Sequence, residues 1–233
     1  KGKQVLDAYL QAWEDRMAKV EKLETKIVLT ETEGRAKTVY TGEASLMRPN
    51  MAKMFLKLQD DPSDNRRWRH YVSDGKYLWE YLYRQKIARV QQLPEKGIDN
   101  TLLAFLFGMK AADIKTRYAL HVDPLNPDKF NEHYIYIDIW PKAKEDQQEF
   151  AKAQLVLWKS KDEKYAERWM LPRMLWFQHT NGNQVMWDFQ NTNPSKPLIA
   201  KDFAAPPFPD NTWKSEWMQT PKPVVRNTPS EKP

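Results

Sequence analysis

The feature that most constrains this chain is an alternation of side chains between residues 46 and 83. Two turn signals frame it: Arg48-Pro49-Asn50 separates two alternating segments, and Ser73-Asp74-Gly75-Lys76 supplies the residues that a chain reversal needs. After the second turn the period is two, which is the period of a β-strand. Four aromatic rings share one face of that strand: Tyr77, Trp79, Tyr81 and Tyr83. Such a strand needs a large apolar surface opposite its aromatic face.

Alternation of the same kind predicts about ten strands along the chain. The expected segments are residues 24–32, 39–47, 51–59, 67–73, 77–83, 87–93, 118–122, 133–140, 154–159, 169–179 and 184–191, with a short last element at 198–203. Short polar connections separate most of them, and connections so short join antiparallel neighbours. The clearest hairpin links the segments 169–179 and 184–191 through Thr180-Asn181-Gly182-Asn183.

Two helices interrupt this pattern. Apolar residues recur at spacings of three and four over residues 3–20, which predicts an amphipathic helix: Val5, Leu6, Tyr9, Leu10, Trp13, Met17 and Val20. A second, shorter helix is expected over residues 101–107, ended by Gly108. This helix is apolar nearly all round, so it must be covered on several sides or lie across an apolar opening. Both interpretations, a plug in the core and a lid, stay open.

These elements predict an α+β fold. A sheet of about ten twisted strands is too wide to stay flat. We therefore expect a strongly curved antiparallel sheet, an incomplete β-barrel, covered by the N-terminal helix and by the short mid-chain lid helix. A chain of 233 residues with 41% hydrophobic residues is long enough for one domain of this size. We place that domain at residues 1–213 and a flexible, polar, proline-containing tail at residues 214–233.

The sequence offers little for catalysis or metal binding. It has no cysteine, and its four histidines, His70, His121, His133 and His179, fall in four different predicted strands without metal-ligand spacing. A nucleophile elbow, a phosphate-binding glycine loop and paired carboxylates on one element are all missing. We therefore expect a protein that is not an enzyme and that needs no cofactor and no metal.

Charge and hydropathy limit the partners. The net charge of +6 is mild and scattered, and the basic-aromatic hexamer at residues 66–71 alternates as an amphipathic strand does, so we expect no nucleic-acid binding. No apolar run approaches the roughly 20 residues that cross a bilayer, which predicts a chain that is not an integral membrane protein. Because the chain opens directly into a helix pattern, we expect it to be either cytoplasmic or exported with its signal removed.

The segment at residues 72–81, VSDGKYLWEY, resembles the periplasmic outer-membrane lipoprotein carriers, the LolA-like family. Both helices, a strand ending in Arg48-Pro49-Asn50 and a closing Asp202-Phe203…Pro206-Pro207 motif extend the resemblance over about residues 4–213. It implies an incomplete antiparallel barrel, covered by helices, whose cavity takes up the acyl chains of lipoproteins. The loops at residues 60–65 and 159–167 and the tail after Trp213 look longer than the family needs.

The resemblance also implies a site. By motif position, Arg48 corresponds to the family's arginine that bonds to lid carbonyls, so we expect it to latch the lid. Methionine and tryptophan suit a lipid-binding lining, because Met adapts its shape and Trp offers a large apolar surface. The candidate apolar lining comprises Leu6, Leu10, Trp13, Phe55, Trp79, Tyr81, Leu102, Leu103, Phe105, Leu106, Trp176 and Trp187. The alternation leaves open which face of each strand points inward.

The expected function is that of a soluble carrier in the periplasm, its export signal removed. It would bind the acyl chains of lipoproteins or lipids in an apolar cavity under a helical lid and transfer them toward the outer membrane. Its partners would be an acylated lipoprotein or lipid, an inner-membrane donor protein and an outer-membrane acceptor protein, and the chain would act as a monomer. The same fold also serves envelope sensors, so the alternative is a regulatory or scaffold module that binds a protein or lipoprotein partner.

Overall fold

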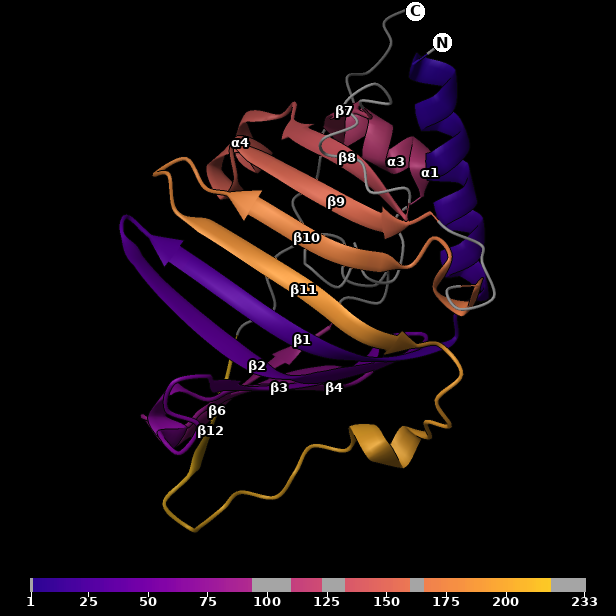
Figure 1. Cartoon of the computed structure of the whole chain (residues 1–233). Coiled ribbons are helices and arrows are strands. Elements are labelled where there is room, and N and C mark those ends of the chain that lie inside the picture. Colours follow the sequence, from indigo (N-terminus) through magenta and orange to yellow (C-terminus); the bar gives the residue numbers. More distant parts are fainter. Residues whose placement is uncertain (1, 94–109, 123–132, 160–165, 219–233) are drawn as a thin grey trace, which may run out of the picture.

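The structure, a computed structural model, describes residues 2–93, 110–122, 133–159 and 166–218 (Figure 1). Helices α1 (Gly2–Lys19), α3 (Ala111–Arg117) and α4 (Lys144–Glu149) lie in these ranges, with 3-10 turns at Asn65–Arg67, Ala166–Arg168 and Ala200–Phe203. The strands are β1 (Lys22–Glu33), β2 (Ala36–Met47), β3 (Met51–Leu58), β4 (Arg69–Asp74), β5 (Tyr77–Leu82), β6 (Ile87–Gln92), β7 (Tyr118–His121), β8 (Tyr134–Pro141), β9 (Lys152–Trp158), β10 (Pro172–Gln178), β11 (Gln184–Asn193) and β12 (Lys214–Trp217). The predicted α+β class is confirmed, while the predicted lid at residues 101–107 lies outside the described residues.

All twelve strands of the described ranges belong to one sheet, in the order β12-β6-β5-β4-β3-β2-β1-β11-β10-β9-β8-β7. Strands β1–β6 pair consecutively and antiparallel, and so do β7–β11. Antiparallel pairing of β1 with β11 joins these two meanders. At this junction Thr25 and Thr192 share a buried hydroxyl hydrogen bond of 3.0 Å. Strand β12 differs from the others because it pairs parallel to its neighbour, β6.

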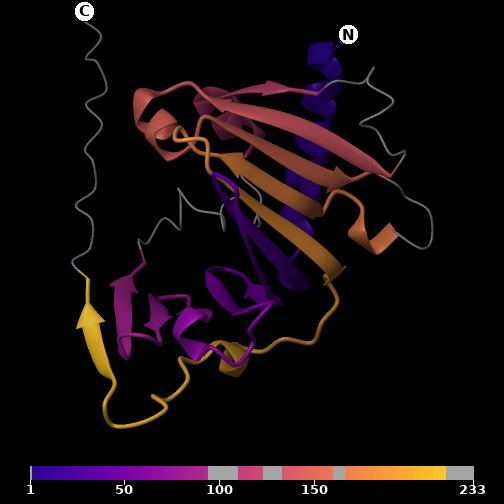
Figure 2. The ribbon, with the colours of Figure 1, turned by 60° about the vertical axis from the view of Figure 1, so that its left-hand side comes forward.

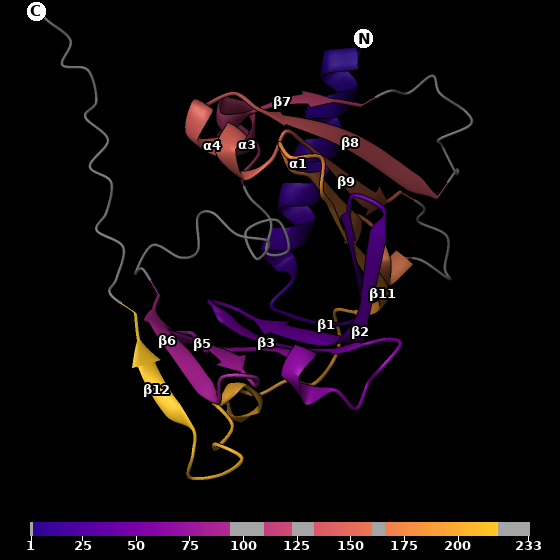
Figure 3. The same ribbon diagram turned by 90° about the vertical axis from the view of Figure 1, so that its left-hand side faces the viewer.

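The two meanders lie in differently oriented parts of the sheet. Figure 2 shows β7–β11 and β3–β6 as two groups of strands, with the long strands β1 and β2 between them. Helix α1 stands on one side of the sheet, next to both groups (Figure 3). The strand order begins at β12 and ends at β7, so the described sheet has two edges. Barrel-like curvature of this sheet stays a prediction.

Helix α1 forms where the sequence predicted it and presents its apolar stripe to the sheet. Leu10, Trp13, Met17 and Val20 are all buried. Arg16 and Lys19 occupy the last turn, where positive charge stabilises the negative end of the helix dipole. The stripe packs into the main hydrophobic cluster, which includes Leu29 of β1 and strand residues from β2, β3 and β7–β11. The core of the protein therefore lies between α1 and the sheet.

The aromatic face of β5 is covered by the C-terminal arm, which we define as residues 198–218. In this arm the Pro206 carbonyl accepts a hydrogen bond of 2.9 Å from the Tyr81 hydroxyl. Trp213 is 7% exposed and packs against Tyr81 and Tyr83, with ring centroids 6.0 and 5.1 Å apart. Figure 2 shows the arm on the opposite side of β3–β6 from α1. The large apolar surface that the aromatic strand requires is thus supplied by the arm.

The arm ends in strand β12. Lys214–Trp217 fall in the segment that the sequence analysis assigned to a flexible tail, yet they pair with Ile87–Val90 of β6. The four residues of β12 are exposed, and Trp217 is 64% exposed. Pairing and the anchor at Trp213, rather than burial of β12 itself, hold this end of the arm on the sheet.

Gly42 allows β2 and β3 to approach each other closely. It lies opposite Leu56 in the pairing of the two strands. A Cβ atom at position 42 would overlap the carbonyl oxygen of Phe55 and come within 2.9 Å of the Leu56 Cα. Both of these atoms belong to the backbone, so no side-chain rotation relieves the overlap. Only glycine fits here without moving a strand.

A buried histidine lies among the rings that the arm covers. His70 of β4 is 8% exposed and stacks on Tyr81 at 4.7 Å between ring centroids. Its Nδ1 atom shares a hydrogen bond of 3.0 Å with the Tyr83 hydroxyl. Burial, together with the nearby positive charge of Lys53, lowers the pKa of His70 from 6.5 to about 4. The ring is therefore neutral in the folded protein at neutral pH.

We expect the stability of the protein to fall as the pH is lowered from 6.5 toward 4. In that window the imidazole of the unfolded chain binds a proton that folded His70 does not bind, so acid favours unfolding; below pH 4 this contribution is constant. The depressed pKa corresponds to roughly 3 kcal/mol. Urea titrations across this range, on the wild type and on His70→Phe, measure it. In His70→Phe the free energy of unfolding should depend less on pH between 6.5 and 4. Tyr83→Phe, which keeps the histidine, should retain the pH dependence of the wild type. An unchanged slope in His70→Phe would show that other groups cause it.

Candidate ligand-binding site

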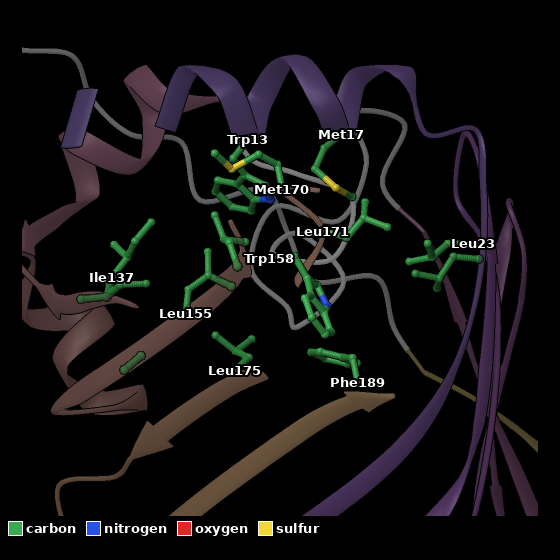
Figure 4. Packing of buried hydrophobic residues seen from close by; sticks show 14 of the residues in the cluster. Trp13, Met17, Leu23, Ile137, Leu155, Trp158, Met170, Leu171, Leu175 and Phe189 are labelled. Carbon is green, nitrogen blue, oxygen red and sulfur yellow. The ribbon is translucent and has the colours of Figure 1, made fainter. Parts of the chain in front are cut away.

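The candidate site is the apolar layer between α1 and the sheet. Figure 4 shows Trp13 and Met17 pointing from α1 toward the strands, with Met170, Leu171 and Trp158 beside them and Leu155, Leu175 and Phe189 on the strands below. All of these residues are buried and belong to the main hydrophobic cluster. Both walls of the layer are therefore apolar, and two methionines lie between them. Thioether side chains adapt to irregular contacts, so this layer suits a flexible apolar ligand.

Trp13 brings a polar group into this layer, as Trp158 does. Its side chain is fully buried, at 0% exposure. Among the described residues, no acceptor bonds to its indole nitrogen, Nε1. An unpaired buried donor typically costs about 1–3 kcal/mol. The helix thus carries a hydrogen-bond donor on its apolar face.

A few polar contacts fix the edges of α1. The Glu14 carboxylate accepts a hydrogen bond of 2.9 Å from the Ala111 backbone N–H, at the start of α3. Lys115 of α3 forms an ion pair of 2.6 Å with Asp7, and both side chains are about half exposed. Arg16 donates a bond of 2.6 Å to the Glu167 carbonyl. These polar contacts position the helix at its edges. The side of the helix that faces the sheet contacts it through apolar side chains.

Arg48 caps the C-terminal end of α1. Its guanidinium donates bonds of 2.9 Å to the Met17 carbonyl and 3.1 Å to the Val20 carbonyl. The Arg48 backbone N–H also donates to the Glu21 carbonyl, at 2.9 Å. Carbonyls at a helix end have no partner within the helix, so this side chain satisfies them and stabilises the end. Arg48 therefore bonds to a helix carbonyl, but the described partners are Met17 in the last turn of α1 and Val20 directly after it. Its predicted bond to a lid at residues 101–107 lies outside the described residues and stays a prediction.

Four of the predicted lining residues lie on the α1 side of the sheet or on α1 itself. Leu10 and Trp13 belong to the main cluster, and Leu6 and Trp187 pack against it. Leu102, Leu103, Phe105 and Leu106 lie outside the described residues.

The other four predicted lining residues lie on the opposite face. Phe55 contacts Trp68 and His70, whereas its neighbour Leu56 belongs to the main cluster. Trp79 and Tyr81 pack with Trp213 of the arm. Trp176 donates a hydrogen bond of 3.1 Å to the Gln184 side chain, and its neighbours Leu175 and Phe177 are the residues that face the main cluster. The structure thus separates these four rings from the candidate site.

Sequence reasoning missed Met170 and Leu171. They precede β10, and Met170 adopts a positive φ of 59°, which departs from the extended backbone predicted over residues 169–179. Both side chains are buried in the layer under α1. The signal available in the sequence was an apolar pair directly before Pro172, since a proline often marks the start of a strand.

The face of the sheet that α1 covers becomes polar on β4–β6. Pairing places Arg69 and Tyr71 beside Leu56 and Met54, so these polar side chains share the face of the main cluster. Arg69 forms an ion pair of 2.6 Å with Glu31, and the Tyr71 hydroxyl donates to the Glu80 carboxylate at 3.1 Å. Burial and the neighbouring Glu80 charge raise the pKa of Tyr71 to about 12. One face of the sheet therefore has an apolar half and a half in which polar side chains mix with Leu78, Leu82 and Ile87, an arrangement that suits an amphiphile.

The described ranges contain neither a candidate metal-binding site nor a helix that could span a membrane. In them, His, Asp and Glu side chains form no group of three that could hold a metal ion. The helices of the same ranges are too short or too polar to cross a membrane.

This chain is similar to known proteins in structure, but its sequence matches neither a family model nor a curated protein. An uncharacterized conserved protein from Thermus thermophilus has a TM-score of 0.50 and 10% identity, with 89% of this chain and 98% of that chain covered. A putative outer membrane lipoprotein-sorting protein domain from Vibrio parahaemolyticus has a TM-score of 0.46 and 13% identity, with 85% and 95% covered. A LolA superfamily protein from Nitrosomonas europaea has a TM-score of 0.38 and 10% identity, with 84% and 97% covered. The Thermus protein shares the fold, and function has to be argued from the site.

Proposed function

We propose that this protein is a carrier of the bacterial cell envelope. It binds the acyl chains of lipoproteins or lipids between α1 and the sheet and passes them toward the outer membrane. A curved, barrel-like sheet with a lid at residues 101–107 would enclose the chains, and the periplasm is the expected compartment. The transfer requires no chemical reaction, only uptake and release.

The observation that carries this proposal is the apolar layer between α1 and the sheet. Each methylene that moves from water into apolar surroundings contributes about 0.8 kcal/mol, so an acyl chain needs no polar recognition to bind. The ligand has to separate α1 from the strands, and the acyl chain then packs against the apolar side chains that the helix and the sheet had buried against each other. The head of an amphiphile would lie on the same sheet face, beside the polar side chains of Arg69 and Tyr71.

Native mass spectrometry of the purified protein, followed by lipid extraction, tests the proposal. We expect a bound acyl-containing lipid that organic solvent releases and that the folded protein rebinds. A protein that is free of lipid after gentle purification, and that takes up no acyl chain when lipid is supplied, would contradict the carrier function.

A second candidate is a regulatory or scaffold module that binds a protein partner. Its support is the C-terminal arm, where Ile199, Phe208, Trp217 and Met218 are the large apolar side chains that the described residues expose. Exposed apolar residues that gather in one segment often mark interaction surfaces. A protein that contains no lipid and binds none in this experiment would favour the regulatory or scaffold module over the carrier.

We expect Arg48→Leu to bind acyl chains more tightly and to release them more slowly. The bonds from Arg48 to the Met17 and Val20 carbonyls stabilise the closed position of α1, which is the position without ligand. Removing them favours the open position, which binds the ligand. Bonds to a charged group contribute about 1.5–3 kcal/mol, so the affinity should rise roughly 10- to 100-fold.

Release of a fluorescent fatty-acyl probe to acceptor vesicles measures this change. Arg66→Leu provides a matched control, since Arg66 is exposed and pairs with Asp64 in a surface loop. Unaltered exchange in Arg48→Leu, with the fold intact, would remove Arg48 from the mechanism.

A further inference from the structure

The unpaired indole N–H of Trp13 points to the chemistry of the ligand. The side chain is at 0% exposure, and its nitrogen has no hydrogen-bond partner among the described residues. Native structures pair most buried polar groups, so an unpaired one requires an explanation. A phenylalanine would fill much of this space without the unpaired donor. The indole therefore adds a hydrogen-bond donor to the layer that is proposed to hold the ligand.

The surroundings of Trp13 limit what can accept this bond. Figure 4 places the ring between α1 and the strands, next to Met170, and the labelled side chains around it carry no oxygen that could accept this bond, although Trp158 carries a second indole N–H. A water molecule needs two to four polar partners, so it is poorly held here. A carboxylate would bring an unpaired charge into an apolar layer, and a hydroxyl or a secondary amide would bring its own donor without an acceptor. An ester carbonyl accepts one bond, carries no charge and adds no donor.

We propose that the Trp13 indole N–H donates a hydrogen bond to the ester carbonyl of an acyl chain bound between α1 and the sheet. This inference rests on the proposed carrier function and narrows it to ester-linked acyl chains. The apolar walls bind the hydrocarbon, and Trp13 fixes the depth at which the ester lies. Ether-linked chains and ionised fatty acids would bind less tightly, because an ether lacks the carbonyl oxygen that projects from the chain toward a donor, and a carboxylate is charged.

A matched pair of lipids tests the inference. The probes are 1-lauroylglycerol and 1-O-dodecylglycerol, which have the same glycerol head and the same chain length and differ in the carbonyl. Equilibrium dialysis with mass-spectrometric quantification gives both dissociation constants below the concentrations at which the lipids aggregate. A net hydrogen bond contributes about 0.5–1.5 kcal/mol, so we expect the wild type to bind the ester roughly 3- to 10-fold more tightly than the ether.

Two variants locate this preference. Trp13→Phe, with its fold checked by circular dichroism, should bind both lipids with equal affinity. Trp176→Phe is the control, because Trp176 also donates an indole hydrogen bond but lies on the opposite face of the sheet. It should keep the preference of the wild type.

The outcomes separate the inference from the function on which it rests. Equal binding of ester and ether by the wild type, or an undiminished preference in Trp13→Phe, overturns the role of Trp13 and leaves the carrier function standing. If the wild type binds neither lipid, both the inference and the carrier function fail. The wild-type comparison needs no variant, so misfolding of Trp13→Phe does not prevent the test.

Discussion

Alanine at position 42 is expected to prevent this chain from folding stably. Gly42 sits in β2 where the backbone of β3 comes so close that a single added Cβ atom overlaps the Phe55 carbonyl oxygen. Relief of that overlap requires the two strands to separate, and β2 also pairs with β1 along twelve residue positions. We expect a loss of about 3 kcal/mol or more, a large part of the stability of an ordinary domain.

Urea unfolding, or the soluble yield where Gly42→Ala does not accumulate, measures this loss. Thr41→Val is the control on the neighbouring position, because valine and threonine are nearly the same size and this side chain points to the other face of the strand. We expect that control to change stability by less than about 1 kcal/mol. A Gly42→Ala protein as stable as the wild type would mean that β2 and β3 lie farther apart than described.

Trp213→Ala is expected to release residues 204–218 of the C-terminal arm while the rest of the sheet stays folded, because Leu198 and Phe203 of the arm are buried separately against Met47. Trp213 is the buried ring of the arm that fills the space against Tyr81 and Tyr83, and Phe208 of the same arm stacks on it at 6.1 Å between ring centroids. Replacing a buried tryptophan by alanine removes about 3–5 kcal/mol. Other contacts of this part of the arm are mostly exposed: the Tyr81–Pro206 hydrogen bond, the bonds from Lys86 to Asp210 and Thr212, and the strand β12 with its Arg89–Glu216 ion pair and Tyr77–Trp217 ring contact. Opening of the arm should therefore become at least 100-fold more frequent.

Limited proteolysis with mass mapping of the fragments measures that opening. We expect rapid cleavage of Trp213→Ala within residues 204–218 and a resistant fragment that contains β1–β11. Trp217→Ala is the matched control, since Trp217 is 64% exposed and its loss removes little buried surface. Equal cleavage rates for the wild type and Trp213→Ala, or cleavage throughout the Trp213→Ala chain, would show that the arm is not a separately opening unit.

Local pattern predicted most of the elements of this fold. Helix α1 and the hairpin of β10 and β11 form where short-range periodicity and turn residues placed them, because both depend on neighbours in the sequence. The amphipathic alternation predicted over residues 66–71 is also present, because His70 lies on one face of β4 and Arg69 and Tyr71 lie on the other.

What the sequence could not predict depends on distant pairing. Period-two alternation divides the side chains of a strand between two faces, but it does not show which face is turned toward the core. Tyr81 is an example. Its ring was expected in the interior, but the arm, more than a hundred residues later, covers it. Trp176 lies away from α1 for the same reason, because both faces of its strand carry apolar side chains. The parallel pairing of β12 with β6 carries no turn signal, so the sequence pattern did not reveal it.

For the candidate site, the sequence identified the helix but not its counterpart. Leu6, Leu10 and Trp13 were placed correctly on the buried stripe of α1 because helical spacing defines that stripe. The residues opposite them, such as Met170 and Leu171, depend on how β10 enters the sheet. Arg48 was found through its motif, and the structure adds that it caps α1.

The junction between β1 and β11 sets the order in which this protein can assemble. The residues Lys22–Glu33 of β1 precede their partners on β11 by about 160 residues, so they reach the compartment in which the chain folds before those partners do. Until then β1 has one hydrogen-bonded neighbour, and its other edge stays open to any passing strand. Contacts between such distant segments slow folding. During that time β1–β6 can pair with one another, and the open edge of β1 can pair with another chain. A holding chaperone that shields that open edge would benefit this protein more than one whose strands all pair with their sequence neighbours.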